Sequence, residues 1–93
     1  MSLSDFIRKK RLGAFLTQQD AAKLLGYNRP QFLSNLERGN RKPPIDVLKK
    51  MCEIYSIPED EMKAEYVRQA TTDAIYNAHQ KWNTGEETDK NPK

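Results

Sequence analysis

The stretch TQQDAAKLLGYNRPQFLSNLERG, residues 17–39, decides the fold because it predicts two short helices joined by a tight turn. Thr17 can cap the first helix, with Asp20 three residues later as the acidic partner of a capping box. Each helix is expected to end at a glycine, the first at Gly26 and the second at Gly39. The apolar residues of the first helix share one face at helical spacing: Ala21, Ala22 and Leu25.

The second helix should run over about residues 30–38, because a proline in the first turn sacrifices no hydrogen bond. Asn28 is its expected cap. Leu33 and Leu36 would be buried, whereas the opposite face is polar and basic: Gln31, Ser34, Asn35 and Arg38. Two crossed helices of which the second is polar on its open side are the arrangement that places a recognition helix in the DNA major groove.

With these features the sequence resembles the helix-turn-helix domains of lambdoid phage repressors, Cro proteins and their bacterial relatives, the xenobiotic response element (XRE) family, over about residues 3–62. The shared motifs open and close the two helices: Thr17-Gln18, Ala22, Leu25-Gly26 and Leu36-Glu37-Arg38-Gly39. The chain departs from the commonest family pattern by one extra residue near positions 27–29.

The resemblance implies an all-α, five-helix lambda-repressor-like DNA-binding domain over residues 1–62. Beyond it, apolar spacing predicts a helical extension over residues 63–83, and a polar composition with glycine and proline predicts a disordered tail over residues 84–93. In this family an arginine of the first helix pairs with the last glutamate of the recognition helix, here Arg11 with Glu37. The alternative is that both are ordinary surface charges. If the pair is partly buried, removal of one partner leaves the other charge without compensation.

The helix-turn-helix pattern and the family resemblance make double-stranded DNA the expected partner. Gln31 is the best candidate for reading a base, because a carboxamide can bond N6 and N7 of adenine together. Phe32 has two interpretations, contact with a thymine methyl group or packing against a neighbouring helix. The expected base contacts are Arg29, Gln31, Phe32 and Asn35. The expected phosphate contacts are Gln18, Tyr27, Asn28, Ser34, Arg38, Asn40, Arg41 and Lys42.

The charge distribution agrees with this interpretation. The chain has 93 residues, of which the first 50 carry 11 Lys and Arg against 4 Asp and Glu, and the last 43 carry 5 against 9. The basic half is thus the half with the helix-turn-helix pattern. Because phosphate contacts supply most of the non-specific affinity for nucleic acid, this coincidence favours DNA binding more than charge alone would.

Other classes of function have little support in the sequence. Cys52 is the single cysteine and His79 the single histidine, so neither a disulfide nor a metal-ligand cluster is expected. No catalytic constellation or phosphate-binding glycine loop is present, so we expect neither an enzyme nor a cofactor. No apolar run approaches the ~20 residues of a membrane span, and the N-terminus lacks a signal-peptide pattern, which favours a cytoplasmic protein.

The remaining helices follow from apolar periodicity. A first helix over about residues 3–12 would be capped by Ser4, and Phe15 and Leu16 after it are expected in the core. A fourth helix should start after Pro44 without a side-chain cap. Its expected buried face is Ile45, Leu48, Met51, Cys52 and Tyr55.

The C-terminal extension carries apolar residues four apart, which predict a helix of some 24 residues, with an interruption at residues 71–73 left open. We expect this helix to form a homodimer. The expected contacts are Tyr66, Ala70, Ala74, Ile75, Ala78 and Trp82. Two alternatives remain: the segment folds back on its own domain, or it holds a partner protein, which would make the chain an antitoxin or adaptor. The leading hypothesis is a transcriptional repressor that binds an inverted-repeat operator as a homodimer.

Overall fold

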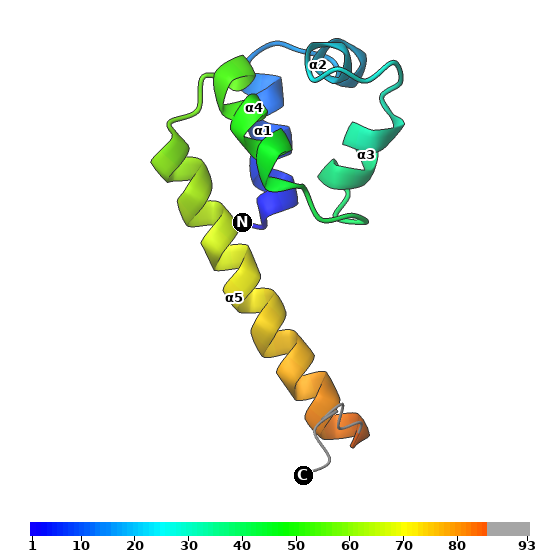
Figure 1. Cartoon of the computed structure of the whole chain (residues 1–93), viewed down its shortest axis with the longest axis vertical. Helices are drawn as coiled ribbons and strands as arrows, with labels where there is room; N and C mark the ends of the chain where they lie inside the picture. Colours follow the sequence, from blue (N-terminus) through cyan, green and yellow to red (C-terminus); the bar gives the residue numbers. More distant parts are fainter. Residues whose placement is uncertain (86–93) are drawn as a thin grey trace.

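The computed structural model of the chain describes residues 1–85, and five α-helices make up this part. They are α1 (Leu3–Gly13), α2 (Gln18–Leu24), α3 (Gln31–Glu37), α4 (Ile45–Tyr55) and α5 (Glu59–Thr84). The predicted all-α architecture is confirmed, with no strand among the described residues. The first four helices form a head, from which α5 extends as an arm (Figure 1). The predicted disordered tail lies, from residue 86 on, outside the described residues.

Local capping explains where α2 begins and ends. The hydroxyl of Thr17 accepts a hydrogen bond from the backbone N–H of Asp20 at 3.0 Å, and the Asp20 carboxylate accepts one from the N–H of Thr17 at 3.5 Å. Gly26 has a φ of +96°, and the N–H of Tyr27 then donates to the carbonyl of Ala22 at 2.8 Å. This C-terminal cap turns the chain toward α3.

Two predicted caps were wrong. Ser2, not Ser4, caps α1, because its hydroxyl accepts the N–H of Asp5 at 3.1 Å. Helix α3 has Pro30 at its N-cap and no side-chain cap. Asn28 lies two residues earlier, and its carbonyl accepts a hydrogen bond from the side-chain amide of Gln19 at 3.2 Å. Asn28 therefore ties the turn to α2 and does not start α3.

The core lies where α1 packs against α3 and α4, and where α2 packs against α3. Its fully buried members include Ile7, Leu33, Leu36 and Met51. Two predicted core residues are exposed. Phe15 is 93% exposed, because its φ of +61° reverses the chain after α1 and leaves its neighbours Ala14 and Leu16, but not Phe15 itself, packed on the core. Ile45 is 52% exposed, because it begins α4 at the edge of the core, beside α5.

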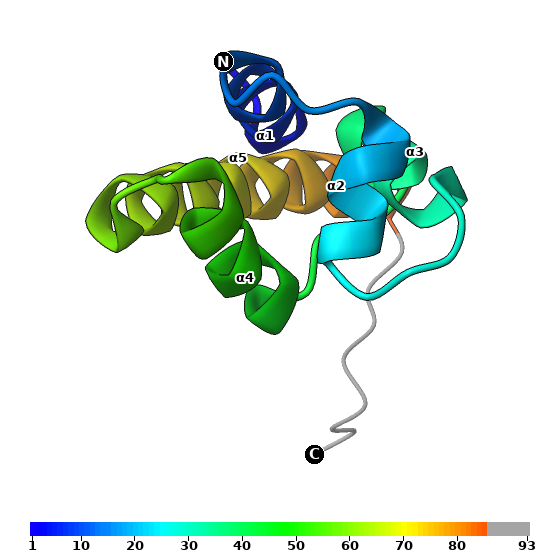
Figure 2. The same ribbon diagram turned by 90° about the horizontal axis from the view of Figure 1, so that it is seen from above.

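Helix α5 is continuous across the interruption left open at residues 71–73, and it crosses the boundary predicted after residue 62. In Figure 2 it passes between α1 and α4, and it packs against both. The apolar residues of the arm are four apart, and each step of four residues advances about 40° around a helix. This apolar stripe therefore winds around α5, and Trp82 lies about 200° around the helix axis from Met62. Met62 and Tyr66 accordingly pack on the head, whereas Ile75 and Trp82 are exposed, at 55% and 86%.

An ion pair between Arg11 and Glu37 links α1 to the end of α3. The guanidinium donates twice to the carboxylate, at 2.7 Å and 3.0 Å, and once to the carbonyl of Leu16 at 2.8 Å. The amide of Gln18 also donates to Glu37, at 3.0 Å. Arg11 and Glu37 are 6% and 5% exposed, and the hydrogen bond to Glu37 raises the pKa of Arg11. Burial of the Tyr55 hydroxyl, together with the negative charge of Glu37, raises the pKa of Tyr55 to about 12.

We predict that Glu37→Ala destabilises the fold by about 3–5 kcal/mol, because Arg11 would stay buried without its counter-charge. Urea denaturation followed by circular dichroism measures the change. Glu61→Ala is the matched control, since its partner Lys10 lies 3.3 Å away in a solvent-exposed pair. Such pairs contribute about 0–1 kcal/mol. Equal small losses for both variants would show that the buried pair does not hold the fold.

Candidate nucleic-acid interface

The open face of α3 carries the residues that the sequence assigned to DNA. At about 100° per residue, four side chains fall within an arc of about 100°, opposite Leu33. They are Gln31, Ser34, Asn35 and Arg38. Two hydrogen bonds order this face: the Gln31 amide donates to Asn35 at 3.3 Å, and the Arg38 guanidinium donates to Ser34 at 2.9 Å. The Gln31 amide oxygen and the Asn35 amino group can still bond a base edge.

Phe32 lies at the side of this face, in an aromatic pair. Its ring stacks on that of Tyr27, with centroids 4.4 Å apart and planes at 24°. Both rings are half-buried against the core. The guanidinium of Arg41 lies 5.3 Å from the Phe32 ring centroid. The pair braces the turn that contains exposed Arg29, and contact of Phe32 with a thymine methyl group stays a prediction.

The loop after α3 places further cations beside this face. Gly39 has a φ of +78°, and the N–H of Asn40 donates to the carbonyl of Asn35 at 3.0 Å, which turns the chain back along α3. Asn40, Arg41 and Lys42 are exposed. Within residues 27–42 the only acid is Glu37, which is buried in its ion pair. The charged side chains exposed along α3 and its flanks are therefore all positive: Arg29, Arg38, Arg41 and Lys42.

Two contacts were not foreseen from the sequence. The side chain of Gln18, an expected phosphate contact, is directed toward Glu37, so the N-terminus of α2 would meet a phosphate mainly through its backbone N–H groups. Lys42 lies 3.7 Å from Asp73 on α5, which brings the predicted phosphate loop next to the arm. The Asp73 carboxylate also accepts a hydrogen bond from Gln69, whose side-chain oxygen accepts the N–H of Leu3.

Metal clusters and membrane-spanning helices are not found within residues 1–85. No three His, Cys, Asp or Glu side chains there are grouped to hold a metal ion. None of the helices in this part is long and apolar enough to cross a membrane. The feature that stands out is the polar, cationic face of α3, a helix that the buried ion pair links to α1 and that packs against α2.

A family model described as helix-turn-helix matches residues 7–62, which run from within α1 to the first turn of α5. The chain belongs to the XRE-type helix-turn-helix family. This XRE-type protein is accordingly a DNA-binding protein of transcription regulation, with α2 and α3 as its helix-turn-helix. No curated protein and no solved structure matches the chain. The individual base and phosphate contacts of this XRE-type protein remain predictions.

We predict that Gln31→Ala reduces discrimination between the preferred site and random DNA by about 1–3 kcal/mol, because one bidentate base contact is lost. Binding of both duplexes is measured at one stated salt concentration. Gln80→Ala, on the exposed arm, is the control and should leave both affinities unchanged. If Gln31→Ala weakened both duplexes by the same factor, Gln31 would not read a base.

We predict that Arg41→Ala weakens specific and random DNA about equally and lowers the slope of log K against log salt by about 1, because one phosphate contact is removed. A salt titration of each duplex measures the slope. Arg68→Ala removes an exposed arginine of α5 that pairs with Glu65, outside the interface. The control should keep the wild-type slope, and a wild-type slope for Arg41→Ala would exclude a phosphate contact there.

Proposed function

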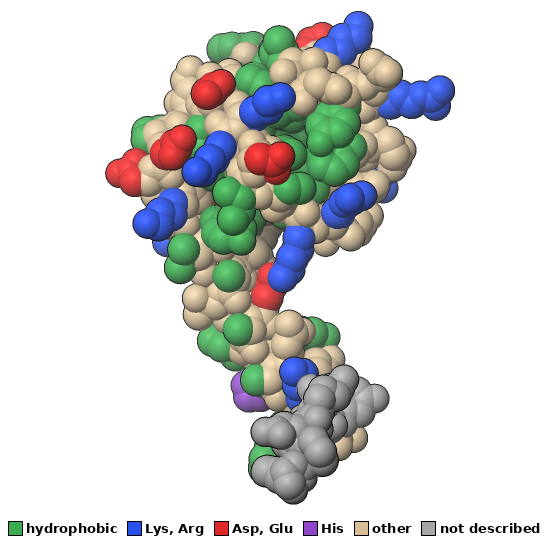
Figure 3. Space-filling model, in the orientation of Figure 1, with side chains coloured by type: hydrophobic (Ala, Val, Ile, Leu, Met, Phe, Trp, Pro, Cys, Tyr) green, Lys and Arg blue, Asp and Glu red, His purple; other side chains and the backbone are tan. Residues whose placement is uncertain are grey.

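We propose that the protein represses transcription by binding, as a homodimer, to an inverted-repeat operator that overlaps a promoter. The observation that carries this proposal is the separation of two surfaces: a cationic α3 face on the head, and an exposed apolar face on the distal part of α5 (Figure 3). The first suits a DNA half-site, and the second suits a partner subunit.

The arm supports dimerisation by its length. Helix α5 has 26 residues and is therefore about 39 Å long. The ion pair of Asp73 with Lys42 ties it to the head about half-way along. Beyond this point Ile75 and Trp82 are exposed, at 55% and 86%. The proximal half thus folds back on its own domain, including Tyr66, and the distal half holds the apolar surface available to a second subunit.

A two-fold dimer would present two copies of α3 to the same side of a duplex. Recognition helices about 34 Å apart read half-sites one DNA turn apart, and the two-fold symmetry of the protein requires an inverted repeat. The loop with Arg41 and the N-terminus of α2 would contact phosphates on either side of each α3. A dimer bound across a promoter excludes the polymerase from it, which is the proposed repression.

The exposed distal part of α5 also suits a second candidate, an antitoxin or adaptor that holds a different protein. The two candidates differ in what the isolated chain does. A homodimer forms at tens of micromolar without any other protein, whereas an adaptor arm stays uncovered until its partner is added. Sedimentation of the purified chain therefore distinguishes them.

The test combines selection and transcription. Duplexes bound by the full chain are selected from a random library at a stated salt concentration, and the enriched site is then placed over a promoter for transcription in vitro. We expect an inverted repeat with half-sites one turn apart, and loss of transcript as the protein is titrated. A single, unrepeated site bound by a monomer would refute the dimer, and a rise in transcript would refute repression.

A further inference from the structure

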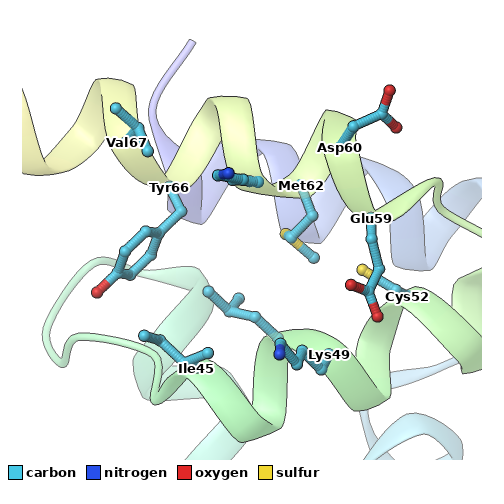
Figure 4. Close-up of a pocket in the computed structure, with 10 residues that line it drawn as sticks. Ile45, Lys49, Cys52, Glu59, Asp60, Met62, Tyr66 and Val67 are labelled. Atoms are coloured by element: carbon cyan, nitrogen blue, oxygen red, sulfur yellow. The ribbon is translucent and has the colours of Figure 1, made fainter.

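A groove with a volume of about 590 Å³ lies between α4 and α5. Figure 4 shows its two walls, which run antiparallel. At one end Tyr66 of α5 extends toward Ile45 of α4, with Val67 on the far side of Tyr66, and at the other end Cys52 lies near Glu59. The half-exposed apolar side chains of Ile45 and Val67 leave this surface unfilled within the described chain.

The distal part of α5 has an apolar face whose residue spacing matches that of the groove. Ile75, Ala78 and Trp82 line a shallow hollow on one side of α5. Val67, Ala78 and Trp82 fall within about 60° of one another around the helix, so the wall of the groove and the distal face are continuous. Ile75 and Trp82 are seven residues apart, as are Ile45 and Cys52, and each interval is about 10 Å, or two helical turns.

We propose that in the homodimer the distal arm of each subunit lies antiparallel in the α4–α5 groove of the other subunit. Ile75 enters the groove beside Ile45 and Val67, and Trp82 enters it beside Cys52 and Glu59. This inference rests on the proposed homodimer and specifies its interface.

Two-fold symmetry is consistent with this exchange of arms. Antiparallel pairing of the two α5 helices places Val67 opposite Ile75 of the second copy and Asp60 opposite Trp82 of the second copy. Thr71 is midway between residues 67 and 75 and also midway between residues 60 and 82. A single two-fold axis beside Thr71 therefore produces both pairings, and each pairing occurs twice in the dimer. Ala78 lies between Ile75 and Trp82, Ala74 directly precedes Ile75, and the small side chains of both alanines allow the helices to approach closely.

Charge favours a second copy as the occupant. Residues 74–84 contain no Asp or Glu, and Lys81 lies next to Trp82. The end of the groove that would receive Trp82 carries Glu59 and Asp60 in the first turn of α5. Antiparallel helices bring the acidic N-terminus of one to the basic C-terminus of the other, which the helix dipoles also favour. Lys49 and Lys63 flank the groove and can cover the guest helix with their aliphatic stems.

Trp82 is the only tryptophan of the chain, so its fluorescence reports directly on this contact. The full chain is diluted through its dimer dissociation range, and emission and iodide quenching are recorded beside sedimentation. As the dimer forms, emission should move to shorter wavelength and quenching should fall, because a ring that is 86% exposed becomes buried. Trp82→Ala should weaken dimerisation more than about tenfold, as expected for a large aromatic anchor.

Variants of the groove test its role separately. Ile45→Glu and Val67→Lys each put a charge at a half-exposed position of the groove, and each should restore iodide quenching of Trp82 and weaken dimerisation more than about tenfold. The two substitutions lie on different helices, so the test still works if one of the variants misfolds. Thermal melting shows whether either variant is misfolded. Tyr76→Glu is the matched control, because Tyr76 is exposed on the side of α5 about 180° from Val67. It should leave both measurements unchanged.

The outcomes separate the two proposals. A dimer in which Trp82 stays as quenchable as in the monomer, or which both groove variants leave intact, would overturn the exchange of arms and leave the dimeric repressor standing. A chain that stays monomeric and selects no inverted repeat would overturn both.

Discussion

The buried ion pair between Arg11 and Glu37 is the interaction on which the placement of α3, the proposed DNA-reading helix, depends. It joins α1, the α1–α2 connection, α2 and α3 at one point, through Arg11, Leu16, Gln18 and Glu37. Two buried charges are stable only when the surrounding groups satisfy their hydrogen bonds. These hydrogen bonds come from different elements, so together they fix how α3 lies relative to α1 and α2. The position of the open face of α3 therefore depends on them.

The ion pair also keeps Glu37, the only acid within residues 27–42, away from the open face of α3. Glu37 belongs to α3, but it points into the head and is neutralised by Arg11, so DNA would meet Arg29, Arg38, Arg41 and Lys42 without a nearby exposed carboxylate within residues 27–42. The exception comes from the arm, where Asp73 approaches Lys42. This contact links the phosphate loop to α5, so the part of the chain proposed to form the dimer also touches the part proposed to bind DNA.

The winding of the apolar stripe divides α5 into two halves with different tasks. A spacing of four residues does not keep side chains on one line along a helix, because the helical repeat is 3.6 residues. The stripe therefore begins on the head at Met62 and Tyr66 and ends on the opposite side at Trp82. One helix thus completes the core of its own domain and carries a second, exposed apolar face, which is the surface proposed for a partner subunit.

The sequence by itself determined what depends on local interactions. The capping box at Thr17, the turns at Gly26 and Gly39 and the polar face of α3 all rest on residues within one or two helical turns, and together they predicted the helix-turn-helix and most of its exposed side chains. Tertiary structure decided what depends on distant residues. Phe15 is apolar yet exposed because the chain reverses there, and Ile45 lies half-exposed because the core ends beside it. Gln18 turns to Glu37, and Lys42 meets Asp73, because packing brings together residues 19 and 31 positions apart, which no local pattern encodes.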